Sequence, residues 1–516
     1  MRTMRWLVVV SMVLFLVLPA ALAQAPGPRY GGTLRAGMQT DPVGLDPHTT
    51  TATATRNMME NVYDTLVTVD PSLHVLPSLA ASWTTSTDGL TWTFHLRPNV
   101  KFHNGRSMTA DDVVYSLNRI RDPKTKSPRA SDFAIIDTVT VAGPLTVAIR
   151  LKQPFSPLLA KLALSTNVIV PHEIVERDGD LNKEPVGTGP FRFVGYTPQQ
   201  RMILVRSGDF WGTDATGRRL PYIDRIEFVF YPDAVARSTA LRTGNVDWIE
   251  YVPSSDVQSL RADPNVEVIG GLSANFRGLY INNTVAPFNN VKVRQAMAWA
   301  INRKEIVDTA LFGVGGVVAT GTAIPPGNYY ALRKNVYDKV DLDRAKRLMA
   351  EAGFPNGLDA DLYVTSTYDF LRTPAELIQA QLAKIGIRTK IVAADWSVYL
   401  PTVFQKHFTL TILGTSGQTD PDDFLYNNFH TGAGSNFEGY SDAQFDKLVE
   451  QARLVAVDSK RRALYDQAQL RLQDTVPMVF LFHSTQYEAA RRNVHGYQHY
   501  LNTSYIGLRT TWMTEK

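Results

Sequence analysis

Cysteine is absent from the 516 residues of this chain. Its absence excludes a disulfide-stabilised scaffold, a thiolate metal site, a cysteine nucleophile and a lipid anchor attached through cysteine. An excess of charge of one sign is also absent: 53 Lys and Arg against 49 Asp and Glu leave a net charge of +4, without basic clusters. No nucleic-acid partner is therefore indicated. Beyond the N-terminus there is no run of about 18 apolar residues, so the sequence predicts no membrane-spanning helix there.

The one long apolar stretch lies within residues 1–23, which have the layout of a secretory signal peptide. Arg2 and Arg5 form a charged start, Leu7–Leu18 an apolar core, and an Ala-x-Ala motif ends at Ala23. A membrane anchor is the alternative, but Leu7–Leu18 is shorter than the ~20 residues that cross a bilayer. We expect cleavage after Ala23 and a periplasmic protein without a lipid anchor.

The length predicts more than one domain, because single hydrophobic cores stop growing near ~250–300 residues. Strict alternation of apolar residues predicts strands, and apolar residues at helical spacing predict helices. The strand-like runs include Gly32–Met38, Leu90–Leu96, Val139–Leu151 and Pro477–Phe482, and the helix-like runs include residues 55–66, Val291–Leu311 and Ser459–Thr475. Thr109 and Asp112 form a capping pattern at the start of a further helix. The alternation of strands and helices predicts an α/β fold.

Motifs for catalysis or metal binding are not evident. None of the 10 histidines lies in a His-Glu-x-x-His motif. Carboxylates pair at Asp420 and Asp422 and again at Asp41 and Asp46, where they could serve acid–base chemistry or cap helices and loops. An exported α/β chain without a catalytic constellation favours a binding protein. The alternative from another class is a secreted hydrolase that uses Asp420 or Asp422.

Residues 81–119 contain Ala-Ser-Trp, Asp-Gly, Leu-Arg, Val-Lys-Phe-His and Ala-Asp-Asp-Val, in that order. Further blocks follow at Pro185–Phe191, Ala240–Asp247, Pro287–Ala296 and Thr419–Asp422. In composition and order these blocks resemble the family 5 extracellular solute-binding proteins, the peptide and nickel receptors of ABC importers. The resemblance covers essentially the whole mature chain.

The resemblance implies a type II periplasmic-binding fold, an α/β architecture with two lobes joined by a hinge. Lobe one would comprise residues 24–275 and a C-terminal return over 486–516, with an extra subdomain at about 63–188, and lobe two would comprise 276–485. A ligand would be buried between the lobes as they close. We expect a monomer without cofactor, bound metal or catalytic activity, whose partners are the ligand and the permease subunits of the importer in the inner membrane.

The resemblance also suggests ligand contacts in three places: the first-lobe loop, two aromatic-bearing segments of lobe two, and the loop that leads to the Asp-Pro-Asp motif. The candidates are Thr40, Asp41, Tyr368, Arg372, Trp396, Tyr399, Gly414, Thr415, Ser416, Gly417, Gln418 and Asp420. Aromatic side chains in such loops make apolar platforms for a ligand.

Peptide-binding relatives carry a sequence like Gly-Trp-Thr-Gly-Asp in the last of these loops, and its Asp pairs with the amino terminus of the peptide. The register places Gly414 at the Trp and Gly417 at the Asp, so both side chains are missing here. Arg372 lies near a basic position that pairs with a ligand carboxylate in some relatives. A peptide-type ligand is the family default, and an oligosaccharide stacked on aromatic residues or a nickel chelate is the alternative.

Overall fold

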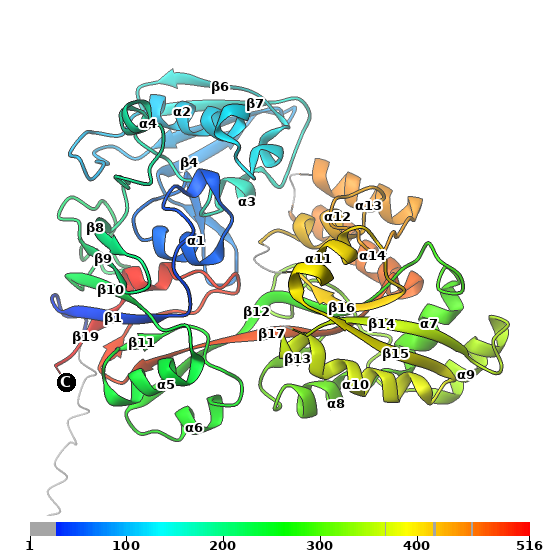
Figure 1. Ribbon diagram of the computed structural model, residues 1–516. Coiled ribbons are helices and arrows are strands. Elements are labelled where there is room, and N and C mark those ends of the chain that lie inside the picture. Colours follow the sequence, from blue (N-terminus) through cyan, green and yellow to red (C-terminus); the bar gives the residue numbers. More distant parts are fainter. Residues whose placement is uncertain (1–26, 367, 416–418, 456–457, 516) are drawn as a thin grey trace, which may run out of the picture.

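The computed structural model describes residues 27–366, 368–415, 419–455 and 458–515, which form two halves joined by long strands (Figure 1). A mixed sheet of 11 strands runs through both halves of this described part. Its strands are β1 (Thr33–Met38), β8 (Phe191–Thr197), β9 (Arg201–Arg206), β10 (Arg225–Phe230), β11 (Trp248–Ile249), β12 (Val266–Ile281), β13 (Gly316–Val318), β14 (Leu358–Thr365), β15 (Ile387–Ala394), β16 (Leu410–Gly414) and β17 (Met478–Arg491). Smaller sheets contain β2 (Val67–Val69) and β3 (Val75–Pro77), β4 (Ala80–Thr85), β5 (Thr91–Leu96), β6 (Ile136–Gly143) and β7 (Thr146–Leu151), and β18 (Val494–His495) and β19 (Trp512–Met513).

The helices fall into two groups, one in each half. The first group is α1 (Thr53–Met59), α2 (Ala110–Arg121), α3 (Leu158–Leu162), α4 (His172–Asp178), α5 (Ala234–Thr243) and α6 (Val257–Arg261). The second group is α7 (Val291–Ala300), α8 (Arg303–Glu305), α9 (Leu342–Glu351), α10 (Asp369–Ala383), α11 (Trp396–Phe404), α12 (Pro421–Phe429), α13 (Ala443–Leu454) and α14 (Asp458–Thr475). We call the part with β1–β11, α1–α6 and the segment after β17 the first half, and the part with α7–α14 and β13–β16 the second half. Among the described helices we find none with the length and apolar character that a bilayer crossing requires.

β12 and β17 connect the two halves. They pair antiparallel along almost their whole length, and the register shifts between Leu272 and Phe276. In the first half β17 also pairs with β11, and in the second half β12 pairs with β16. The predicted lobe boundaries at 275/276 and 485/486 both fall inside these two strands. That the halves are lobes which move about this point stays a prediction.

Alternation along β17 sends its side chains into two different cores of the second half. Val479 and Leu481 pack on one face of the sheet with α7, α9 and α10, whereas Met478 and Phe480 pack on the other face with α11–α14. Successive residues of a strand point to opposite faces, so a sheet covered on both sides needs apolar residues at every position. The continuous apolar run at the start of β17 meets this requirement, and the predicted α/β fold is confirmed.

The block at residues 81–119 contributes to a separate sheet of the first half, with strand order β4-β5-β7-β6 and α2 packed against it (Figure 1). Trp92 and Phe94 on β5 are buried, as the alternation predicted. The prediction of one strand over Val139–Leu151 was wrong. The segment forms most of a hairpin, because a turn at Pro144 separates β6 from β7.

The helix predicted over residues 55–66 is α1, and it ends at Met59. Beyond it the Asn61 carbonyl accepts a hydrogen bond from the Phe191 N–H, and the Val62 carbonyl accepts one from the Gly189 N–H. These tertiary hydrogen bonds replace the helical ones that the pattern predicted.

The helix predicted over Val291–Leu311 is interrupted. α7 ends at Ala300 because Ile301 is extended, and the Asn302 side chain then caps α8 by accepting the Glu305 N–H. A π-helical turn over Ile306–Ala310 follows. An Asn that caps the next turn ends the first helix although the apolar spacing continues past it.

Candidate functional site

The two halves meet where α3 lies close to α12. Lys161 Nζ on α3 lies 2.5 Å from Asp423 Oδ1 on α12 and 3.5 Å from Asp132 Oδ1. On the adjoining loop, the Ser156 N–H donates to the Arg453 carbonyl at 2.7 Å. Burial opposes the charged form of Lys161, but the two carboxylates outweigh it and raise its pKa above the ordinary range. The second half therefore presents a carboxylate to a buried cation of the first half.

Asp420 stands at the start of α12 and is engaged by its own half. Its side chain caps the helix by accepting the Asp422 N–H at 2.9 Å, and Arg461 on α14 donates to both carboxylate oxygens at 2.9 and 2.5 Å. Asp422 Oδ1 lies 2.8 Å from Arg453 Nε, and burial raises the pKa of this carboxyl to about 6. Both acids therefore pair with arginines, and Asp420 also caps α12. This arrangement indicates a structural role for the two acids rather than the acid–base chemistry of a hydrolase.

The loop ahead of Asp420 starts from the end of β16. A side chain at Gly414 would begin 2.0 Å from the Phe276 carbonyl oxygen, so this backbone leaves no room for one. Arg277 donates to the Thr415 carbonyl at 2.9 Å, and the Thr415 N–H donates back to the Phe276 carbonyl at 3.2 Å. Ser416, Gly417 and Gln418 lie outside the described residues.

The predicted contacts of the first-lobe loop lie at the surface. Thr40 is exposed, and Asp41 is half-buried beside the β8–β9 hairpin. Asp41 Oδ2 accepts hydrogen bonds from the Tyr196 hydroxyl at 2.7 Å and from the Gln199 N–H at 2.6 Å. Asp41 is thus engaged by the hairpin of its own half.

The aromatic candidates of the second half form a row. The rings of Tyr368 and Trp396 meet edge to face at 4.9 Å, and Trp396 stacks on Tyr399 at 5.5 Å. Tyr399 is fully buried, and its hydroxyl donates to the Ile412 carbonyl at 2.8 Å. Arg372 is exposed near the start of α10. The structure therefore brings Tyr368 and Trp396 together near the surface, while Tyr399 anchors them to the core.

Two of the cavities at the junction of the halves are lined in part by Thr419, next to Asp420. The larger, about 330 Å³, is lined by Trp83 and Leu159 from the first half and by Tyr330, Asp420 and Arg461 from the second. The smaller, about 40 Å³, is lined mainly by the first half, from α1 and from the C-terminal segment around Ser504, and by Thr419 from the second half. Sequence reasoning missed α1 and the C-terminal segment as site elements, because only the fold brings them together.

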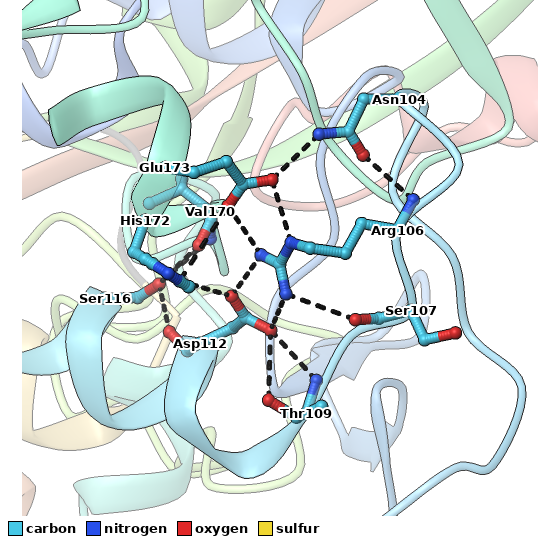
Figure 2. Close-up of polar contacts among 9 residues, drawn as sticks. All are labelled: Asn104, Arg106, Ser107, Thr109, Asp112, Ser116, Val170, His172 and Glu173. Atoms are coloured by element: carbon cyan, nitrogen blue, oxygen red, sulfur yellow. Dashed lines mark hydrogen bonds and ion pairs between the residues drawn. The ribbon is translucent and has the colours of Figure 1, made fainter. Parts of the chain in front are cut away.

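A third polar cluster lies in the first half, away from the junction, and Figure 2 shows it in close-up. Asp112, His172 and Glu173 have ligand atoms close enough to hold a metal ion. However, Arg106 lies between the acids: its Nη2 is 2.5 Å from Asp112 Oδ1, and its Nε is 2.8 Å from Glu173 Oε1. Its guanidinium supplies the positive charge that an ion would bring.

The same cluster completes the predicted capping box of α2. Asp112 Oδ2 accepts the Thr109 N–H at 2.9 Å (Figure 2). Burial opposes ionisation of Glu173, but hydrogen bonds from Arg106 and Asn104 outweigh it and lower the pKa of its carboxyl to about 2. The cluster ties α2 to α4 through ion pairs, which is a structural role.

Comparison with known proteins identifies the family. Residues 74–436, more than half of the chain, match the family described as bacterial extracellular solute-binding proteins, family 5, middle region. The chain is 32% identical to Heme-binding protein A of Haemophilus influenzae, over 85% of this chain and 84% of that protein. It is 31% identical to the dipeptide-binding protein of Escherichia coli, over 82% of this chain and 83% of that protein.

Solved structures give the same answer for the fold. HbpA2 of Haemophilus parasuis superposes with a TM-score of 0.84 at 30% identity, covering 94% of this chain and 100% of that one. The periplasmic binding protein DppA of Helicobacter pylori, in complex with the peptide STSA, superposes with a TM-score of 0.77 at 29% identity, covering 94% and 99%. The family match, the relatives and the shared fold lead to one conclusion: this chain belongs to the family 5 bacterial extracellular solute-binding proteins.

Proposed function

We propose that this protein is the periplasmic receptor of an ABC importer, which captures a peptide-like or related small solute between its halves and delivers it to the permease in the inner membrane. Membership of a solute-binding family makes it a binding protein rather than a hydrolase. The observation that carries the proposal is the junction itself, where polar groups of both halves line cavities beside two long connecting strands. A ligand that touches both halves stabilises the closed arrangement, and a permease reads that arrangement.

Two measurements test this function. Mass spectrometry of small molecules released from freshly purified, denatured protein should identify a bound solute. Small-angle scattering with and without that solute should show a more compact molecule when it is bound, and binding should be saturable without turnover. A scattering profile that does not change at saturation contradicts closure, and chemical conversion of the solute contradicts the receptor role.

The names of the relatives indicate which classes of ligand the family binds. Relatives that match this chain by sequence are named for binding heme, dipeptides, or di- and tripeptides, and a further one for glutathione. A peptide-type solute therefore remains our first proposal. The edge-to-face pair of Tyr368 and Trp396 favours an oligosaccharide as the second, because sugar rings stack on such aromatic surfaces.

We predict that the receptor binds peptides with a free α-amino terminus little better than the same peptides with that terminus blocked. Gly417 supplies no side chain where peptide-binding relatives supply a carboxylate, and burial of an unpaired ammonium costs several kcal/mol. Di- to pentapeptides and their N-acetylated forms should therefore bind with affinities within about tenfold of each other by calorimetry. Much tighter binding of the free amines would mean that another carboxylate reaches that terminus.

Lys161→Met tests the contact between the halves. The substitution leaves the buried Asp423 without its cation, so the closed arrangement should lose stability relative to the open one. We expect ligand affinity to fall by roughly tenfold or more, with a less compact scattering profile at equal ligand concentration. Lys183→Met, at an exposed site of the same half, is the matched control. Wild-type affinity and compaction in Lys161→Met would show that this pair does not hold the halves together.

A further inference from the structure

The smaller cavity at the junction differs from the larger one in its charges. It lies against α1, which supplies Arg56, against the segment that follows α1, which supplies Glu60 and Asp64, and against Arg509 of the C-terminal segment. Thr68, Ser165, Ser504 and Thr419 add hydroxyl groups to its wall. A cavity with two arginines and two acids is neutral in sum, so the pairing of these groups decides what it attracts.

One acid and one arginine neutralise each other. Arg509 Nη1 donates to Asp64 Oδ1 at 2.6 Å, and Arg509 also donates to the Tyr63 carbonyl at 2.8 Å. Asp64 Oδ2 accepts from the Thr188 hydroxyl and from the Trp211 ring N–H, both at 2.9 Å. This pair therefore belongs to the structure of the first half and offers no net charge to a ligand.

Glu60 is engaged by the C-terminal segment. Its Oε1 accepts the Ser504 hydroxyl at 2.8 Å and also accepts the Tyr505 N–H. Only 5% of the residue is exposed. Burial raises the pKa of this carboxyl to about 7, so Glu60 carries only part of a negative charge at neutral pH.

Arg56 is the group left without a partner. Among the described residues, none lies within hydrogen-bond or ion-pair distance of its guanidinium, although the side chain is half-buried in the cavity wall. Burial lowers its pKa, Glu60 raises it in part, and the positive charge of Arg129 lowers it further. An arginine still stays charged, so the cavity holds a desolvated cation, with a second cation nearby and no full counter-charge.

We propose that this cavity receives a carboxylate of the transported solute and that Arg56 is its ion-pair partner. A guanidinium matches a carboxylate with two parallel hydrogen bonds. The volume of about 40 Å³ holds roughly three water-sized groups, which suits the three heavy atoms of a carboxylate. The site lies on α1 of the first half and is separate from Arg372 on α10. The inference rests on the proposed receptor function and names the chemical class of its ligand.

The test compares an acid with its amide. Calorimetry is run with N-acetyl-Ala-Ala and N-acetyl-Ala-Ala-amide on wild type, Arg56→Gln, Arg56→Lys and the exposed control Arg192→Gln. We expect wild type and the control to prefer the acid by about tenfold or more, Arg56→Gln to lose this preference, and Arg56→Lys to keep part of it. In parallel, mass spectrometry should find an acidic solute released from wild type and at least about tenfold less of it from Arg56→Gln. Thermal unfolding of each variant shows whether it is folded.

The outcomes separate the two proposals. An unchanged preference for the acid in folded Arg56→Gln, equal binding of acid and amide by wild type, or a released solute without an acidic group overturns the role of Arg56 and leaves the receptor function standing. If the probes do not bind, the released solute decides: an acidic solute depleted in Arg56→Gln supports the inference, and one retained in that variant overturns it. No released solute and no saturable binding would overturn the receptor function together with this inference.

Discussion

Replacement of Arg461 by methionine is expected to lower the free energy of unfolding by about 3–5 kcal/mol. The side chains of Arg461 and Asp420 are only 6% and 8% exposed, and the guanidinium donates to both oxygens of the carboxylate. Without the arginine, Asp420 is a buried anion that keeps only the backbone N–H donors of the first turn of α12 among the described residues. Urea denaturation at pH 7, followed by tryptophan fluorescence, measures the loss.

Two further variants make this result specific. Arg462→Met changes the next residue, which stacks on the Tyr329 ring at 4.6 Å, and should cost about 1 kcal/mol or less. The double variant Asp420→Asn with Arg461→Met removes the uncompensated charge and should recover part of the loss. If Arg461→Met alone stays within about 1 kcal/mol of wild type, Asp420 is solvated or paired elsewhere.

Glu438→Gln should stabilise the protein at alkaline pH and have little effect in acid. Glu438 is fully buried in the second half, and no other described residue donates a hydrogen bond to either of its carboxylate oxygens. Burial raises its pKa to about 8, and Lys406 opposes this only in part. The folded state therefore holds the proton more tightly than the unfolded state does.

The sign of the pH effect follows from this. Because the pKa of Glu438 is higher in the folded state, its penalty is absent below about pH 4.5 and grows as the pH rises towards 8. Glutamine does not titrate, so the variant should gain roughly 2–4 kcal/mol over wild type between pH 5 and pH 8.5. Glu376→Gln, exposed on α10 of the same half, should show no such trend. Parallel stability curves for Glu438→Gln and wild type would mean that Glu438 is ionised in the folded protein.

Local features of the fold could be predicted from the sequence because they depend on near neighbours. The capping box of Thr109 and Asp112, the half-buried strand at Thr91–Leu96 and the doubly covered start of β17 all follow from residue type and spacing. The family could be recognised for the same reason, since its blocks are short and ordered. The interrupted helix after Ala300 was missed because a capping Asn acts within an apolar pattern that continues.

The site could not be predicted in the same way, because its contacts join distant segments. Lys161 and Asp423 are 262 residues apart, and Asn57 beside Arg56 donates to the Thr503 carbonyl 446 residues away. No spacing rule connects such positions, so α1 and the C-terminal segment gave no signal as partners. The resemblance directed attention to Asp420 and Asp41, which the structure shows bound within their own halves.

Because β12 and β17 both pass from one half to the other, they limit the order in which the chain can fold as it is synthesised. β12 leaves the first half and β17 returns to it, so the whole second half is translated between two parts of the first. Trp248 on β11 packs against the rings of Tyr497 and Tyr505 at 5.3 and 5.1 Å, and these arrive only near the end of translation. The second half can complete its own cores first, whereas the first half must wait for its last segment. A chain released from the ribosome after residue 490 should therefore contain a protease-resistant second half and a sensitive first half.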